Sequence, residues 1–118
     1  MEFKNHKPIF LQIADRICDE ILGGRYPEGE RLPSVREYAT EVEVNFNTVA
    51  RSFEWLSQKE IIFNRRGLGY FVSEGAKENI LQSLREAFFK ETLQELIQQM
   101  EKLDIEVEEV EKALKAER

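Results

Sequence analysis

The chain of 118 residues is nearly devoid of residues that form disulfides or bind transition metals, because it holds one cysteine and one histidine. Cys18 has no second cysteine to pair with, and its place in an amphipathic segment is typical of a small core residue. His6 and Cys18 are too few ligands for a His/Cys metal site within one chain. We therefore expect no disulfide, no metal and no cofactor.

Long apolar segments are also absent. No stretch approaches the roughly 18 consecutive apolar residues that a membrane helix needs, and the N-terminal sequence MEFKNHKPIF has no apolar signal core. The sequence therefore predicts a cytoplasmic protein without membrane contact. With 42% apolar residues the chain can bury one core, so we expect one domain plus an appendage at most.

Catalytic patterns are missing as well. No serine or cysteine motif has a histidine partner, and the glutamates lie along predicted helix faces, where they are usually solvated. The segment Gly67-Leu68-Gly69 lacks the longer glycine pattern of a phosphate-binding loop. We expect no enzymatic activity.

An excess of positive charge is also absent, since 17 Lys and Arg stand against 23 Asp and Glu and the formal net charge is −6. Residues 76–118 hold seven Lys or Arg against eleven Asp or Glu, so this part is the more acidic one. Residues 64–73, NRRGLGYFVS, hold two arginines and no acid. Because phosphate contact is local, such a segment lets an acidic chain bind nucleic acid.

Helical spacing appears from Pro8, where isoleucines recur every four positions, and it predicts a first helix that ends at Gly23-Gly24. After a turn-rich connection, from which Leu32 is expected to return to the core, Ser34 and Glu37 fit a capping box for a helix from Val35. The apolar face of this second helix is predicted as Val35, Tyr38, Ala39 and Val42.

A third helix is predicted immediately after the second, with Asn45 as its cap. Its apolar face comprises Phe46 or Val49, then Phe53 and Leu56. The β-branched and aromatic segments Ile61–Phe63 and Tyr70–Val72 flank two glycines and predict a β-hairpin. This order predicts a mainly α winged helix-turn-helix domain over residues 1–75.

Residues 76–118 contain no glycine or proline and are predicted to form a helical dimerisation tail. Apolar residues alternate at spacings of four and three, as in a coiled coil, at Phe89, Leu93, Leu96, Met100, Leu103, Val107, Val110 and Leu114. Ile105 lies off this seam, so a turn near Asp104 that splits the tail remains an alternative to one continuous helix.

Short polar side chains and arginines gather where a recognition helix would meet the major groove. The predicted DNA-binding residues are Ser34, Arg36, Asn45, Asn47, Thr48, Arg51, Arg65, Arg66, Gly67 and Gly69. Each has a structural alternative: Asn45 as a helix cap, Thr48 and the arginines as solvated surface, the hairpin tip as a plain turn. Trp55 and the eight phenylalanines are expected to pack in the core.

Residues 8–72 resemble the GntR family of bacterial transcription regulators in four segments, PIFLQIADRI, GRYPEGERLPSVREYA, VNFNTVARSFEWL and RRGLGYFV. VNFNTVAR and the tail segment KLDIEVEEV are nearest to the YtrA subfamily. The resemblance implies a winged helix domain, a homodimer joined by C-terminal helices, and repression of a nearby operon, often one for a transporter. It also places the DNA contacts at Arg36, the recognition-helix residues named above and Gly67.

Three positions depart from the family pattern: Phe46 replaces the usual proline, Glu60 a turn glycine, and Tyr70 a threonine. We expect Phe46 to alter the reading of one base position. Glu60 brings an acid near the wing, where it either weakens phosphate contact or points away.

The tail is too short to enclose an effector pocket within one chain. The resemblance leaves room for a small-molecule effector bound between subunits and does not identify it. We therefore expect a homodimer on a pseudo-palindromic double-stranded DNA operator. The alternative is a winged-helix protein-interaction module that recruits a partner through its acidic tail.

Overall fold

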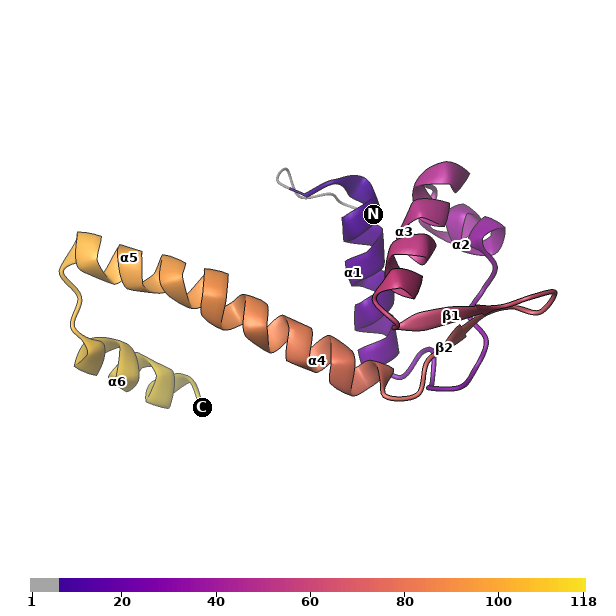
Figure 1. The fold of residues 1–118 in the computed structure, drawn as a ribbon. Helices are drawn as coiled ribbons and strands as arrows, with labels where there is room; N and C mark the ends of the chain where they lie inside the picture. Colours follow the sequence, from indigo (N-terminus) through magenta and orange to yellow (C-terminus); the bar gives the residue numbers. More distant parts are fainter. Residues whose placement is uncertain (1–6) are drawn as a thin grey trace. The chain divides into compact units, whose positions relative to one another are not determined.

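The computed structural model describes residues 7–118, which divide into two compact units, one ending at Leu81 and one spanning Gln82–Arg118. The first unit is a three-helix domain with a β-hairpin, and the second is entirely helical (Figure 1). No helix within residues 7–118 combines the length and apolarity that crossing a bilayer requires.

Helix α1 (Ile9–Leu22) buries the isoleucine stripe that its spacing predicts, with Ile13, Ile17 and Ile21 fully enclosed. Pro8 precedes the helix as its N-cap residue. The helix ends at the predicted glycine pair, where Gly24 takes a φ of +88° that L-residues rarely adopt.

Helices α2 (Val35–Val42) and α3 (Phe46–Gln58) form the predicted tight pair. The capping box at Ser34 is confirmed: the Glu37 amide donates to Ser34 Oγ at 3.0 Å, and the Ser34 amide donates to Glu37 Oε1 at 2.9 Å. Glu43 ends α2 in the left-handed conformation, with φ 56°. Asn45 caps α3, since its Oδ1 accepts from the Asn47 amide at 2.8 Å.

Strands β1 (Ile62–Arg65) and β2 (Gly69–Val72) pair antiparallel, with Ile62 opposite Val72 and Arg65 opposite Gly69. The first strand starts one residue later than predicted and extends to Arg65. The segment before α2 runs along the free edge of β2, where the Leu32 amide donates to the Tyr70 carbonyl at 2.9 Å. Leu32 returns to the core as predicted and is 2% exposed.

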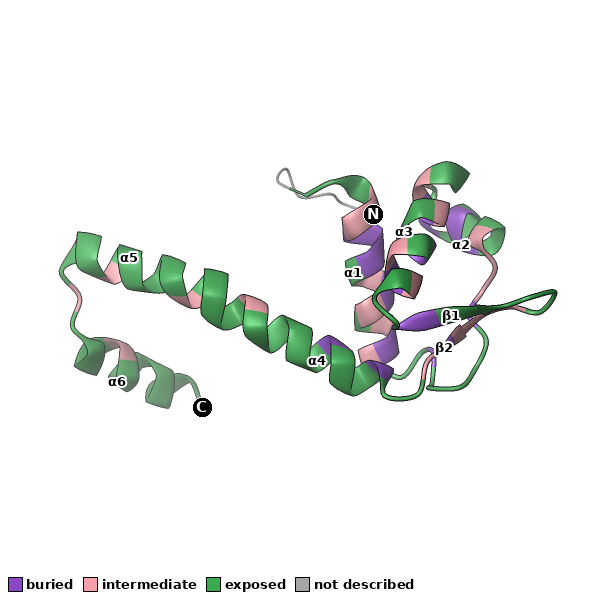
Figure 2. Cartoon of the chain, viewed as in Figure 1, coloured by how far each residue is buried: buried purple, intermediate pink, exposed green. Residues whose placement is uncertain are grey.

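The core lies between α1, α2, α3 and the inner face of the hairpin, as the buried positions in Figure 2 show. On α3 it takes Val49 rather than Phe46, which is 46% exposed. Within residues 7–118 the only buried phenylalanine is Phe53. The expectation that the phenylalanines are core residues is wrong for Phe46, Phe63, Phe88 and Phe89, because helical or alternating spacing defines a face without saying that the face is covered.

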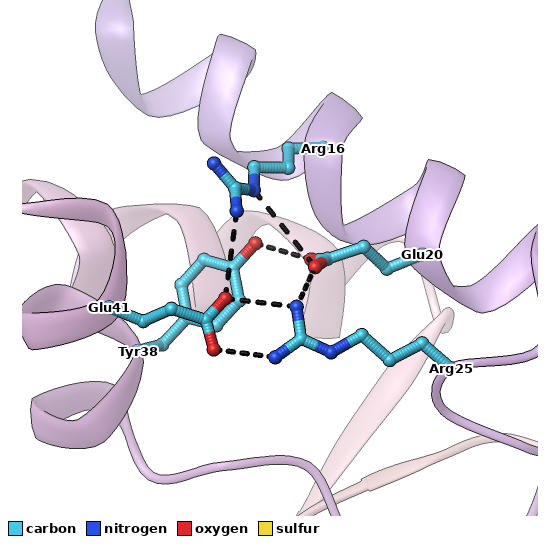
Figure 3. A network of polar contacts seen from close by, with 5 residues as sticks. All are labelled: Arg16, Glu20, Arg25, Tyr38 and Glu41. Atoms are coloured by element: carbon cyan, nitrogen blue, oxygen red, sulfur yellow. Dashed lines mark hydrogen bonds and ion pairs between the residues drawn. The ribbon is translucent and has the colours of Figure 1, made fainter. Parts of the chain in front are cut away.

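A polar network ties α1 and the following loop to α2 (Figure 3). The Tyr38 hydroxyl donates to Glu20 Oε1 at 2.5 Å, and Arg25 contacts Glu20 and makes a two-pronged pair with Glu41 at 2.9 and 2.5 Å. Arg16 Nη2 lies 3.6 Å from Glu41 Oε2. Burial raises the pKa of Tyr38, so this hydroxyl keeps the proton that it donates.

Helix α4 (Ala76–Ala87) starts inside the first unit, because Ala76 and Ile80 are buried in the core. The Glu28 carboxylate accepts from the Gly75 and Lys77 amides at 2.9 and 3.1 Å and so satisfies donors at the start of α4. These backbone hydrogen bonds lower the pKa of Glu28. The first unit therefore continues past Gly75.

The second unit contains the end of α4, a π-helical turn η1 (Phe88–Thr92), α5 (Leu93–Leu103) and α6 (Val107–Glu117). After α5 the chain turns back (Figure 1). Asp104 takes a φ of 57° at this point, so of the two arrangements that periodicity left open, the split near Asp104 is the one found. No side chain in Gln82–Arg118, all of which the structure describes, is buried (Figure 2).

Candidate nucleic-acid interface

The outward face of α3 carries two of the predicted DNA-binding residues. Asn47 and Arg51 are exposed and lie one helical turn apart, opposite the buried side of the helix. Ala50 is half-buried between them, and Glu54 continues the same face toward the C-terminus. The polar groups for base or phosphate contact are therefore at the N-terminal half of α3.

Two predicted DNA-binding residues have structural roles. Ser34 and Asn45 use their side-chain oxygens to accept backbone amides at the starts of α2 and α3. Asn45 is exposed beside Asn47, and its amide nitrogen is a donor that can point to a base. Capping and contact are therefore compatible at Asn45.

Each arginine near α3 lies over a phenylalanine ring. The Arg51 guanidinium carbon is 3.9 Å from the centre of the Phe10 ring, and that of Arg36 is 5.4 Å from the centre of the Phe46 ring. Such contacts restrict a flexible side chain while leaving its N–H donors at the ring's edge. Both guanidinium groups are thereby positioned before any ligand arrives.

Phe10 holds Arg51 because the start of α1 is fixed against α3. Ser52 Oγ donates to the Phe10 carbonyl at 2.6 Å, and Ser52 is fully buried. A shallow hollow of about 400 Å³ lies at this junction, lined by Pro8, Ile9, Phe10, Asn47, Thr48 and Arg51. Sequence reasoning missed Phe10, because no local pattern shows which side chain a distant helix will place beside it.

The wing forms a second cluster of predicted residues. The turn at its tip is closed by the Leu68 amide, which donates to the Arg65 carbonyl at 2.8 Å, and both Gly67 and Gly69 have positive φ. Arg65 lies over the Phe71 ring at 5.4 Å, while Arg66 is exposed at the tip. The arginines and glycines that the sequence singles out therefore meet at one turn.

Arg31 is a further cation at the wing that the sequence analysis did not single out. Its backbone bridges to Phe71, and a Cβ on Gly69 would stand 3.1 Å from Arg31 Nε. The glycine thus leaves the space that the guanidinium occupies. The sequence offered little indication that Arg31 belongs to the wing, because Arg31 precedes the hairpin by some thirty residues and contacts it only along the edge of β2.

Other chemistry finds little support in the described residues. Within residues 7–118 no three His, Cys, Asp or Glu side chains gather as a metal site would require. Cys18 is half-buried against the core, and burial raises its pKa to about 12, so the thiol is protonated at neutral pH. Glu60 is exposed before β1 with a φ of 62°, which explains why a turn glycine suits this position.

The predicted dimerisation residues all lie in the second unit and face solvent to different degrees. Leu93, Met100 and Val110 are half-buried, and the remaining five, Phe89, Leu96, Leu103, Val107 and Leu114, are exposed by 42 to 65%. The structure therefore leaves most of this apolar seam exposed, and none of its eight residues is buried within Gln82–Arg118.

Comparison with known proteins gives consistent results. The sequence profile of the bacterial regulatory proteins of the gntR family matches residues 10–72. The chain is 36% identical over 114 residues to the uncharacterized HTH-type transcriptional regulator YhcF of Bacillus subtilis, covering 97% of this chain and 93% of that protein. It is 33% identical over 112 residues to the HTH-type transcriptional repressor YtrA of Bacillus subtilis, covering 95% and 85%.

A solved structure gives the same result for the fold. The crystal structure of a putative GntR-family transcriptional regulator from Bacteroides thetaiotaomicron superposes with a TM-score of 0.81 at 49% sequence identity. The match covers 92% of this chain and 95% of that chain, so it includes the helical tail as well as the winged helix domain.

Proposed function

Since this chain belongs to the GntR family of bacterial regulatory proteins and is a DNA-binding transcription regulator, we propose that it acts as a homodimeric repressor on a pseudo-palindromic operator. The observation that carries the proposal is an exposed, polar α3 N-terminus together with an arginine-tipped wing in the first unit, and a largely exposed apolar seam in the second. The nearby operon is the expected target, and a transporter operon is our first choice. We propose no enzymatic activity for it.

We assign DNA binding and dimerisation to different segments of the chain. Residues 1–75 supply the DNA contacts, and residues 76–118 supply the dimerisation tail. In each subunit α3 enters the major groove, where Asn47 and Thr48 face base edges and Arg51 faces a base or the backbone. Arg36 contacts the backbone beside it, and the wing arginines enter a flanking minor groove or grip phosphates.

The net charge of −6 favours a mechanism in which two copies bind DNA together. Few cations face the DNA in one subunit, so we expect one winged helix domain alone to bind weakly. Two linked copies bind a two-part site with an effective concentration that raises affinity by about 10²–10⁴. Dimerisation is therefore part of the DNA-binding mechanism.

The π-helical turn supports the tail's role. In an uninterrupted α-helix, the stripe through Leu84 and Phe88 would lie about 120° around the axis from the stripe through Leu96 and Met100. Leu93 donates its amide to the Phe88 carbonyl, five residues back, so η1 holds one extra residue. That extra residue turns the second stripe back by about 100° and brings both onto nearly one side, where a second copy can cover them.

Selection of bound sequences from a random DNA pool, followed by anisotropy titrations with the selected operator, tests the proposal. We expect a two-fold symmetric site whose half-sites lie about one helical turn apart, and affinity that falls steeply with salt. A protein that binds no fragment even at low salt, yet co-purifies with a fixed protein partner, would instead be the interaction module.

Variants of single arginines test the residue assignment. We expect Arg51→Ala and Arg66→Ala each to weaken operator binding by about tenfold and to reduce the salt slope if the contact is to phosphate. Arg118→Ala, at the end of the tail, is the matched control and should bind normally. If neither Arg51→Ala nor Arg66→Ala weakens binding, the site assignment is wrong.

A further inference from the structure

Phe46 is an exposed aromatic side chain at the first position of α3. It is 46% exposed although Val49 and Phe53, on the same helix, are completely buried. Covering an apolar ring that is exposed to water lowers the free energy of the system, whatever ligand covers it. Binding of a ligand that buries the exposed part of the Phe46 ring would therefore be favourable.

Arg36 fixes this ring in place. The Arg36 guanidinium lies over it, 5.4 Å from its centre, and both residues are exposed in the first turns of α2 and α3. A ring has two faces, so a guanidinium on one leaves the other face and the edge for a further contact. The next residue, Asn47, belongs to the outward face of α3, which places the ring at the border of the proposed base-reading surface.

The major groove offers little apolar surface to such a ring. Guanine, adenine and cytosine present hydrogen-bond donors and acceptors there, whereas thymine adds a 5-methyl group. A phenylalanine cannot pair with donors or acceptors, and facing them would leave their hydrogen bonds unmade. The chemistry of this side chain therefore selects thymine.

We propose that Phe46 is a specificity-determining residue that reads one thymine in each half-site through its 5-methyl group, with Arg36 holding the ring in register. This inference rests on the proposed function, because it requires α3 to lie in the major groove. The contact is apolar, so it adds sequence preference without adding charge.

Uracil substitution tests the contact directly, since uracil differs from thymine only by the methyl group. Each symmetric pair of thymines in the selected operator is replaced by uracil, and the affinity of the full-length protein is measured. We expect replacement of one symmetric pair of thymines to lower the affinity by about fourfold per half-site, which corresponds to the burial of one methyl group. All other pairs should have little effect.

The variant Phe46→Ala completes the cycle. It should bind the thymine operator more weakly than wild type and should respond equally to thymine and uracil at the sensitive pair. Phe46→Leu keeps an apolar side chain and should retain part of the preference. Phe63→Ala, which removes another exposed phenylalanine from the wing, is the matched control and should keep the full uracil response.

The outcomes separate the two proposals. No binding of the wild-type chain to any selected DNA would overturn the regulator mechanism and this inference with it. Tight, selective binding that is insensitive to uracil at every thymine would overturn only the role of Phe46. A change of oligomeric mass in Phe46→Ala, measured by sedimentation, would place the ring at a protein interface and also overturn it.

Discussion

The two units of this chain solve the problem of apolar surface in opposite ways. The unit that ends at Leu81 encloses its apolar side chains among three helices and a hairpin, whereas Gln82–Arg118 has no buried side chain at all. The first unit is also tied by the Arg25 and Tyr38 network and by the Glu28 contact at the start of α4. We therefore expect the first unit to fold without the tail.

The tail has the periodicity of a folded element and lacks a core. Helices shorter than about 12–15 residues are marginal in water unless tertiary packing supports them, and α6 has 11 residues. Helix α5 continues α4 through η1, and neither α5 nor α6 has a buried side chain. In the proposed homodimer, another copy covers their apolar side chains and so stabilises the tail. We therefore expect the stability of the first unit to be independent of protein concentration and the stability of the tail to depend on it.

The contrast between the two units can be tested by truncating one phenylalanine in each. Phe53→Ala removes a fully buried ring that packs edge-on against Tyr38 and Tyr70, so we expect a loss of about 3–5 kcal/mol in the free energy of unfolding. Urea titrations followed by circular dichroism should show this loss at every protein concentration.

The same deletion in the tail should behave differently. Phe88 is 48% exposed and lies on the stripe that η1 aligns with Leu96 and Met100, so Phe88→Ala should leave the unfolding of the first unit unchanged and instead raise the concentration at which subunits dissociate. Sedimentation over a range of concentrations measures that shift. Equal losses of unfolding free energy in Phe53→Ala and Phe88→Ala, independent of concentration, would refute the distinction between the units.

A smaller but still large effect is expected from charges on the seam of α5. Leu96→Glu combined with Met100→Glu puts two carboxylates where a second copy must pack, and burial of unpaired charge is strongly unfavourable. We expect monomers by sedimentation and a loss of operator affinity of about 10²-fold or more, because the two DNA-binding domains are no longer linked.

The control for this variant adds the same charges to the polar side of α5. Gln94→Glu combined with Gln98→Glu has the same spacing but lies off the seam, so it should remain dimeric and bind the operator. A dimer that survives the Leu96 and Met100 replacements would show that the tail seam is not the dimer interface.

Local patterns in the sequence were sufficient to predict much of the first unit. The capping box at Ser34, the cap at Asn45 and the glycines of the wing were found because each depends on residues a few positions apart. The same locality explains why Phe46 was left undecided, since both Phe46 and Val49 fit a helical stripe and only packing chooses between them.

Contacts between distant segments could not be predicted in this way. The Ser52 hydroxyl reaches the Phe10 carbonyl across 42 residues, and Glu28 reaches the Gly75 amide across 47. These contacts place Arg51 on Phe10 and continue the first unit past Gly75, so they decide the shape of the site and its boundary. The π-helical turn is likewise invisible to a heptad count, which assumes a constant twist.

The smallest expected effect is a change in stability when a residue in the left-handed conformation is replaced by glycine. Both units contain such a residue. Glu60, with φ 62°, stands before the hairpin of the first unit, and Asp104, with φ 57°, stands between α5 and α6. A left-handed conformation costs an L-residue about 1–2 kcal/mol, and glycine avoids this strain. Glycine also increases the conformational entropy of the unfolded chain, which cancels part of the gain in stability. We expect Glu60→Gly to stabilise the first unit by about 0.5–1 kcal/mol, measured as a rise of a few degrees in its thermal midpoint.

Asp104→Gly should leave that midpoint unchanged, because aspartate tolerates this conformation better and the first unit does not include Asp104. Glu60→Ala is the control, since it removes the carboxylate but keeps the Cβ. A gain in Glu60→Ala as large as in Glu60→Gly would mean that the acid's charge, and not the backbone conformation, limits the stability of the hairpin.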